Sequence, residues 1–338
     1  MDLSSPSLSF IIPSIHDGSK LECRVYLPTG QQNIQSATGP IRGAIVAHPY
    51  APLGGCYDDP VVGIFGGELL SAGYIVGTFN FRGAGHSEGR TSWTARPELG
   101  DYVSFYGFML QYLKYLKHAF AVNKNDGDDG LSLSQIAQTT GDNETPQIHL
   151  ILGGYSYGSL IVSHVPTLEA MVELFRPAAS PSKPIGEIAR TAKQIAAWSI
   201  DQLPIPNAPA LPDDPWLGLQ TATVSYLLVS PLLPPISQLL TVFSSLSLNV
   251  TVETSRGRHV ACPRPADQLT THRTLALFGD QDNFTSAQKL RKWSSELAHV
   301  PHSQFQWREI DGAGHFWRED GVELRARQIL AEWLSSIR

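Results

Sequence analysis

A serine at the centre of a glycine-flanked pentad is the residue of this chain best suited to covalent chemistry. The pentad G-Y-S-Y-G at residues 154–158 follows the apolar run 148–152 and precedes the apolar segment 159–162. This arrangement predicts a strand, a sharp turn known as a nucleophile elbow, and a helix. Glycine on both sides removes the Cβ atoms that would collide in such a turn. Ser156 is therefore the candidate nucleophile, and the backbone N–H of Tyr157 faces the position where an oxyanion would form.

Two further strand ends, both downstream of the serine, carry a candidate acid and a candidate base. The apolar run 274–278 reads as a buried strand and closes with G-D-Q-D, so Asp280 and Asp282 are both candidates for the acid that orients the base. The run 305–310 also reads as a strand, and it leads through D-G-A-G to His315. A histidine presented in this way is a candidate general base. The chain thus contains nucleophile, acid and base in the order serine, aspartate, histidine.

Strands and helices alternate along most of the chain. The two runs 8–15 and 21–26 are expected to pair antiparallel across the turn 16–19. Further strands are expected over 43–47, 74–79, 148–152 and 226–230, and helices over 61–72 and 103–121. The polar segment 122–146, which is rich in glycine and aspartate, reads as a mobile insertion. Alternation of this kind predicts a mostly parallel sheet that helices cover on both faces.

A proline-rich segment interrupts this alternation after the serine. Residues 166–222 contain repeated prolines and one helix candidate, 185–200, which has an apolar face. We interpret the segment as an inserted cap over a core formed by residues 1–165 and 223–338, and residues 236–272 could extend it. A surface linker is the alternative interpretation. The apolar helix face, which must be buried somewhere, favours the cap.

The composition excludes several classes of function. The chain has 338 residues, a net charge of −6 and no basic block, which argues against nucleic acid or an anionic membrane as a partner. No apolar stretch reaches the roughly 18 residues that a transmembrane helix needs. The N-terminal residues lack the pattern of a signal peptide. Three widely spaced cysteines fit a reducing compartment, so a cytoplasmic location is expected.

No metal site or cofactor site is predicted. The 11 histidines are scattered, without an H-E-x-x-H motif or a quartet of cysteine and histidine. No nucleotide-binding fingerprint is present. Cys56 could be a reactive thiol near the pocket, but a small buried residue is the favoured interpretation.

Taken together, these motifs resemble those of the α/β-hydrolase superfamily over residues 8–122, 147–165 and 223–336. The segments 48–55 and 80–89 are similar to those of compact hydrolases akin to dienelactone hydrolases and serine aminopeptidases. The chain departs from that pattern in its serine nucleophile, where dienelactone hydrolases carry cysteine, and in Cys56 after the double glycine. The insertion 166–222 has no matching counterpart.

The resemblance implies roles for several residues. The acid of this fold lies a few residues past its strand, which favours Asp282 and leaves Asp280 to cap or bend the turn. The oxyanion hole would use the backbone N–H groups of Tyr157 and Tyr50, with Ala51 as the alternative to Tyr50. Four polar residues in the segments 48–55 and 80–89 are expected to be structural: His48, Arg82, Ser87 and Glu88.

The expected activity is hydrolysis of an ester or thioester of a small organic acid through an acyl-enzyme, with a small acyl compound as the only partner. The same groups could cleave a C–C bond in a dicarbonyl or polyketide-like substrate, transfer an acyl group, or cleave a peptide. A non-catalytic ligand receptor is the alternative from another class. The presence of Ser156, Asp282 and His315 argues against a receptor. No oligomeric state is predicted.

Overall fold

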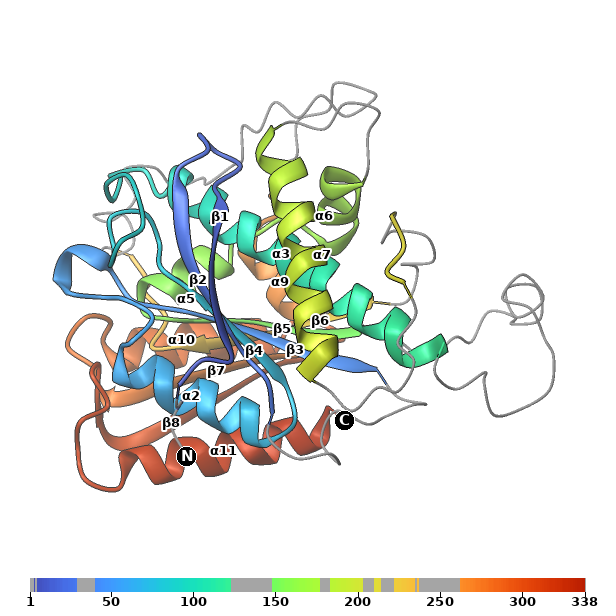
Figure 1. Cartoon of the computed structure of the whole chain (residues 1–338). Coiled ribbons are helices and arrows are strands. Elements are labelled where there is room, and N and C mark those ends of the chain that lie inside the picture. The colour runs from blue at the N-terminus through green and yellow to red at the C-terminus, as the bar shows by residue number, and fades with distance from the viewer. Residues whose placement is uncertain are drawn as a thin grey trace, which may run out of the picture.

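A computed structural model describes Leu3 and residues 5–28, 40–122, 148–176, 183–202, 210–213, 222–234, 236 and 262–337. Within these residues, eight strands form one sheet in the order β1-β2-β4-β3-β5-β6-β7-β8 (Figure 1). The strands are β1 (Leu8–Pro13), β2 (Lys20–Tyr26), β3 (Ile41–Ala47), β4 (Ile75–Phe79), β5 (Ile148–Tyr155), β6 (Ala222–Val229), β7 (Thr274–Gln281) and β8 (Phe305–Gly314).

The sheet is mostly parallel, as predicted. Strands β1 and β2 form the expected antiparallel hairpin, and β2 also pairs antiparallel with β4. From β4 through β3, β5, β6 and β7 to β8, every neighbouring pair is parallel. The carboxyl ends of these strands therefore lie along one edge of the sheet, which is where ligand sites form in open α/β sheets.

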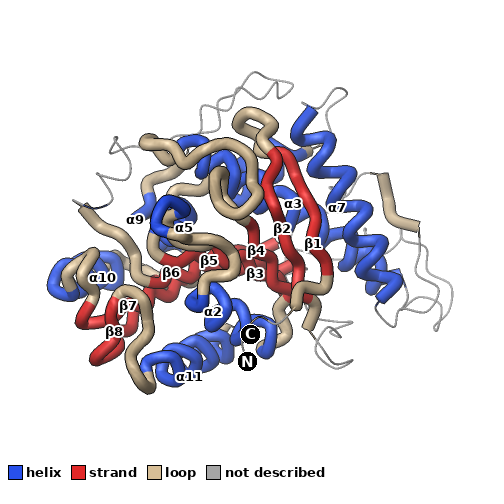
Figure 2. The backbone as a smooth tube through the Cα atoms, turned by 60° about the vertical axis from the view of Figure 1, so that its left-hand side comes forward, coloured by secondary structure: helices blue, strands red, loops and turns tan. Residues whose placement is uncertain are grey.

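Helices cover both faces of the sheet (Figure 2). One face is covered by α2 (Pro60–Ser71) and α11 (Val322–Ser336), which pack against each other and against the sheet. The other carries a larger apolar core, to which α3 (Arg96–Val122) contributes more residues than any other helix. The remaining elements are η1 (Ala51–Leu53), α5 (Tyr157–Val162), α6 (Leu168–Phe175), α7 (Lys183–Gln202), α9 (Pro265–Thr271) and α10 (Ala287–Ala298). Helix α3 begins about two turns earlier than the apolar pattern predicted.

The described part of the proline-rich segment packs against the main body. The predicted helix is present as α7, and its apolar face lies against α3 and β1. The Tyr112 hydroxyl of α3 also hydrogen-bonds Ser199 Oγ of α7 at 2.9 Å. Helix α6, which the sequence did not predict, fits between two prolines and begins at Thr167, whose side chain caps it. The assignment of 166–222 as a cap stays a prediction, and the insertion expected at 122–146 lies almost wholly outside the described residues.

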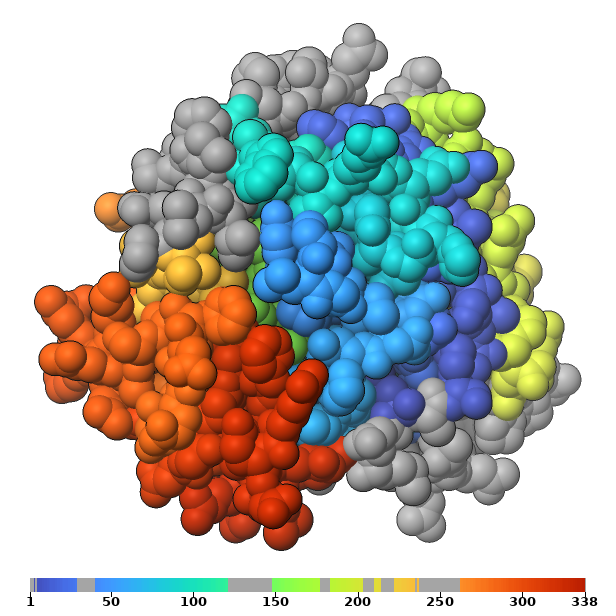
Figure 3. Space-filling view, turned by 90° about the vertical axis from the view of Figure 1, so that its left-hand side faces the viewer, coloured from blue at the N-terminus to red at the C-terminus, as the bar shows by residue number. Residues whose placement is uncertain are grey.

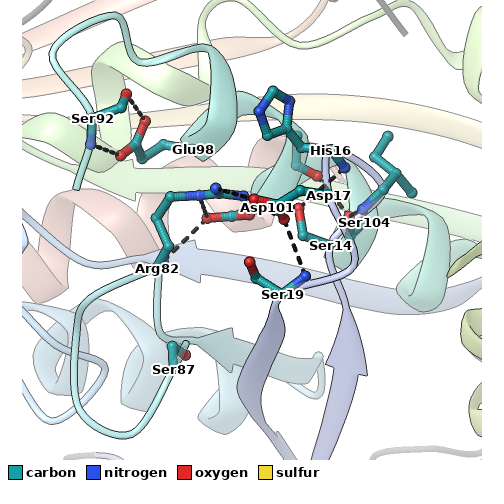
Figure 4. Close-up of polar contacts among 12 residues, drawn as sticks. Ser14, His16, Asp17, Ser19, Arg82, Ser87, Ser92, Glu98, Asp101 and Ser104 are labelled. Atoms are coloured by element: carbon teal, nitrogen blue, oxygen red, sulfur yellow. Dashed lines mark hydrogen bonds and ion pairs between the residues drawn. The ribbon is translucent and has the colours of Figure 1, made fainter. Parts of the chain in front are cut away.

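A buried arginine ties the segment after β4 to two distant parts of the chain (Figure 4). The Arg82 guanidinium donates to both carboxylate oxygens of Asp101 on α3, at 2.9 and 2.7 Å. It also donates to Asp17 in the β1–β2 turn at 2.9 Å. In the same segment Ser87 Oγ donates to the Asn80 carbonyl, and Glu88 accepts from the Lys20 N–H. These contacts agree with the structural role expected for Arg82, Ser87 and Glu88.

One histidine forms a buried hydrogen-bond network away from the carboxyl ends of the parallel strands. His149, near the start of β5, hydrogen-bonds Ser225 Oγ at 2.9 Å and the Tyr74 hydroxyl at 3.2 Å. Burial, with a smaller contribution from Arg42 and Arg273, lowers the pKa of His149 to about 4 from an ordinary value of 6.5. The folded chain therefore keeps this imidazole neutral in a range where an unfolded chain would protonate it.

Acidification from pH 6.5 toward 4 should therefore lower the free energy of unfolding. The unfolded chain takes up a proton at His149 below pH 6.5 and the folded chain does not until about pH 4, so stability is lost as the pH falls, by up to about 3 kcal/mol. Urea unfolding across this range measures the loss. His149→Gln cannot titrate and should lose less stability. The exposed His302→Asn is the control and should behave as the wild type does; an equal loss in His149→Gln would contradict the assignment.

Candidate active site

Ser156 occupies the sharp turn that the pentad predicted. Its backbone dihedrals are φ 55° and ψ −112°, a conformation that residues with a side chain rarely adopt. A Cβ atom on Gly154 would collide with the backbone of Gly158, and one on Gly158 would lie 2.5 Å from the Ala47 carbonyl oxygen. The Ser156 N–H donates to the Val229 carbonyl at 2.8 Å. The turn is thus packed between β3 and β6 and needs glycine at both flanks.

The candidate acid and the candidate base come from the ends of neighbouring strands. Strands β7 and β8 pair regularly as far as Gly279 and Ile310, and then, after an irregularity, Gln281 pairs with Gly314. The next residues along the two strands are Asp282 and His315. The register of the last pair therefore places these two side chains side by side, although they are 33 residues apart.

A continuous chain of hydrogen bonds connects Ser156, His315 and Asp282. Asp282 Oδ2 lies 2.7 Å from His315 Nδ1, and His315 Nε2 lies 2.8 Å from Ser156 Oγ. Because an ionised carboxylate only accepts, Nδ1 carries the proton and Nε2 is free to accept from the serine hydroxyl. All three residues are at most 6% exposed, so little water competes for these bonds. The structure brings together the three residues that the sequence singled out.

The two candidate acids have different partners. Asp282 Oδ1 accepts from the N–H groups of Phe284 and Thr285, at 2.8 and 3.0 Å, which leaves Oδ2 for the histidine. Asp280 Oδ1 instead accepts from the Gly312 N–H at 2.7 Å. Gly312 lies in the irregular end of β8, so Asp280 stabilises the bulge there. The geometry supports Asp282 as the orienting acid and Asp280 as the residue that caps the turn.

Aromatic rings surround the imidazole of His315. Phe284 stacks on it with ring centroids 4.2 Å apart, and Phe316 meets it edge-on at 5.5 Å. The ring centroid of Tyr155 lies 5.6 Å from that of the imidazole, and the Tyr155 hydroxyl donates to the His315 backbone carbonyl at 2.9 Å. Sequence reasoning missed these neighbours, because aromatic residues beside a motif look like ordinary core residues. Only their position next to Ser156, Asp282 or His315 could have drawn attention to them.

The two residues predicted to form the oxyanion hole are adjacent in space. Tyr157 is the first residue of α5, so its N–H has no carbonyl partner within the helix. Tyr50 precedes η1, and its ring lies 5.1 Å from the ring of Tyr157. This neighbourhood is compatible with two N–H groups converging near Ser156. Their role as an oxyanion hole, and Ala51 as the alternative donor, stay predictions.

His48 makes the structural hydrogen bonds that the sequence led us to expect. Its Nε2 accepts from the Phe81 N–H at 2.9 Å, so its Nδ1 carries the proton and donates to the Pro49 carbonyl at 2.6 Å. Burial lowers the pKa of His48 to about 4, and the ring is neutral at pH 7. It connects the segment that contains Tyr50 to the segment after β4.

Part of the chain near the candidate site reaches the surface. In Figure 3 a narrow green strip, from the part of the chain around β5 and α5, lies between the light-blue segment and the orange and red segments.

The structure also bears on the cysteine, metal and membrane expectations. Cys56 is half-buried and free, and the role of its thiol stays a prediction. Within the described residues, no group of three or more histidine, cysteine or acidic side chains could hold a metal ion. In the same residues, no helix is both long and apolar enough to cross a membrane.

Comparison with known proteins identifies the fold. No family model matches this chain, and no curated protein sequence does. A solved alpha-beta serine hydrolase homologue from Coxiella burnetii gives a TM-score of 0.50 at 16% identity, over 98% of each chain. A protein from Xanthomonas campestris, described as an a/b serine hydrolase without lid, gives 0.50 at 16% identity over 100% of this chain and 97% of its own. The chain has the α/β-hydrolase fold, as its motifs implied.

Replacement of the two aspartates should separate their roles. In Asp282→Asn the amide can no longer stabilise an imidazolium or select the Nδ1–H tautomer, so kcat on an ester should fall by about 10⁴. In Asp280→Asn the amide oxygen can still accept from Gly312, so kcat should stay within about threefold. Steady-state hydrolysis of a p-nitrophenyl ester measures both. The reverse ranking would assign the acid to Asp280.

Proposed function

We propose that this chain is a serine hydrolase that cleaves an ester or thioester of a small organic acid through an acyl-enzyme. The observation that carries the proposal is the buried hydrogen-bond chain from Ser156 through His315 to Asp282. The fold it shares with serine hydrolases, and the order of the three residues along the chain, support the same conclusion.

In the proposed mechanism, His315 Nε2 takes the hydroxyl proton as Ser156 Oγ attacks the substrate carbonyl. The resulting imidazolium stays hydrogen-bonded to the Asp282 carboxylate through Nδ1–H, which stabilises its charge. The backbone N–H groups of Tyr157 and Tyr50 donate to the oxyanion. His315 then gives the proton to the leaving group. A water molecule, activated by the same histidine, hydrolyses the acyl-enzyme and releases the acid.

Removal of the serine hydroxyl tests this mechanism. Ser156→Ala should lower kcat on p-nitrophenyl esters by on the order of 10⁴ to 10⁶, because no acyl-enzyme can form. Ser163→Ala is the matched control: it deletes a buried hydroxyl that bonds the Leu160 carbonyl, and it should keep the wild-type rate. A fluorophosphonate should label the wild type and the control, and the labelled peptide should contain Ser156.

The outcomes of a substrate panel distinguish the alternatives. Esters and acyl thioesters should be turned over faster than aminoacyl anilides or a 1,3-diketone. Preference for an anilide would indicate a peptidase, preference for a diketone a C–C hydrolase, and product formed only with an added alcohol an acyltransferase. A wild type that neither reacts with the fluorophosphonate nor turns over any substrate would contradict the proposal and favour a ligand receptor.

A further inference from the structure

Tyr155 connects the strand that carries the nucleophile directly to the residue that carries the base. It is the last residue of β5 and immediately precedes Ser156. Its hydroxyl donates to the backbone carbonyl of His315 at 2.9 Å, and this bond is buried. Two residues 160 positions apart in the sequence are thereby held together. Neither the strand ladder nor the three-residue hydrogen-bond chain includes this contact.

The His315 carbonyl needs a partner that the sheet does not supply. The pairing of β7 with β8 ends at Gly314, so His315 is the first residue beyond the ladder. A buried carbonyl without a partner would be costly, and the Tyr155 hydroxyl meets this need. Further along, the Trp317 indole N–H donates to Ser230 Oγ at 2.9 Å, which holds the same segment to the end of β6. Of these two bonds, only the one from Tyr155 reaches the histidine itself.

The Tyr155 ring is buried and also packs against the His315 imidazole, so the hydroxyl bond is one of two contacts between these residues. The Tyr155 ring borders a cavity of about 410 Å³, which Val61 and Ile64 of α2 and Trp317 also line. On its other sides the ring packs among apolar residues of the sheet, α2 and α11, so Tyr155→Phe keeps this packing and removes only the hydrogen bond. Burial raises the pKa of the Tyr155 hydroxyl, so the hydroxyl keeps its proton and can donate it in a hydrogen bond at neutral pH.

We infer that Tyr155 is a positioning residue, whose hydroxyl holds the backbone of His315 at the distance from which Nε2 reaches Ser156 Oγ. This inference rests on the proposed function, because a hydrolase needs that distance to be kept through the reaction. The residue before the serine then has a defined role, because its hydroxyl joins the strand that precedes Ser156 to the backbone of His315.

Tyr155→Phe removes the hydroxyl and nothing else, and Tyr102→Phe is its matched control. The Tyr102 hydroxyl is also buried and donates to a β5 carbonyl, that of Gly153, at 3.2 Å. Tyr155→Phe should lower kcat on a p-nitrophenyl ester by on the order of 10- to 100-fold, since small displacements of a catalytic group are costly. The labelling rate with a fluorophosphonate should fall in parallel, while KM stays within about twofold. Tyr102→Phe should keep wild-type kinetics, although both variants should unfold at similarly lowered temperatures.

A spectroscopic measurement tests the inference without relying on turnover. The His315 Nδ1–H that bonds Asp282 should give a downfield proton resonance, assigned by its absence in His315→Gln. In Tyr155→Phe this resonance should broaden and exchange faster with solvent than in the wild type or in Tyr102→Phe. If the wild type hydrolyses nothing, the proposed function fails and this resonance still decides the role of Tyr155. An unchanged resonance together with kcat within twofold of wild type would overturn the inference.

Discussion

The backbone conformation of Ser156 is the constraint on which the rest of the site depends. A residue with a side chain at φ 55° and ψ −112° costs on the order of 1–3 kcal/mol, so the surroundings must hold it there. Two features hold Ser156 in this conformation. Its N–H donates a hydrogen bond to the Val229 carbonyl, and Gly154 and Gly158 pack closely against their neighbours. As a consequence, the Ser156 side chain projects beyond the end of β5, and α5 begins at the next residue. Because this turn is packed into the sheet, the backbone holds Ser156, the proposed nucleophile, in one position.

A buried carboxylate is the second constraint, because a desolvated charge must be compensated. Asp282 accepts from two backbone N–H groups on one oxygen and from His315 on the other. The backbone donors fix the carboxylate, and the carboxylate in turn fixes the orientation of the imidazole. The same arrangement stabilises the imidazolium that general-base chemistry would produce, because the opposite charge is already in place and shielded from water. Stability and reactivity at this site therefore depend on the same hydrogen bonds.

The surrounding segments are held by contacts between distant parts of the chain. Arg82 joins the segment after β4 to α3 and to the β1–β2 turn, and His48 joins that segment to the one containing Tyr50. Tyr155 does the same for the segment after β8. These contacts are mostly buried and hydrogen-bonded, so they restrict movement more than exposed ion pairs would. The groups expected to bind an oxyanion, accept a proton and attack a carbonyl thus lie along one edge of the sheet, which these contacts hold in place.

The local features of this protein could be predicted from its residues alone. The glycines around Ser156 follow from collisions within a few residues, and the periods of the apolar runs are set by strand and helix geometry, so the elbow, the mostly parallel sheet and the helix α7 could all be predicted. The different partners of Asp280 and Asp282 could be seen only in the folded chain, because they depend on the register of β7 against β8 and on the bulge near Gly312. The tertiary structure also placed the Tyr155 hydroxyl on His315. Such contacts join residues far apart in the chain, and no local pattern of residue types records them.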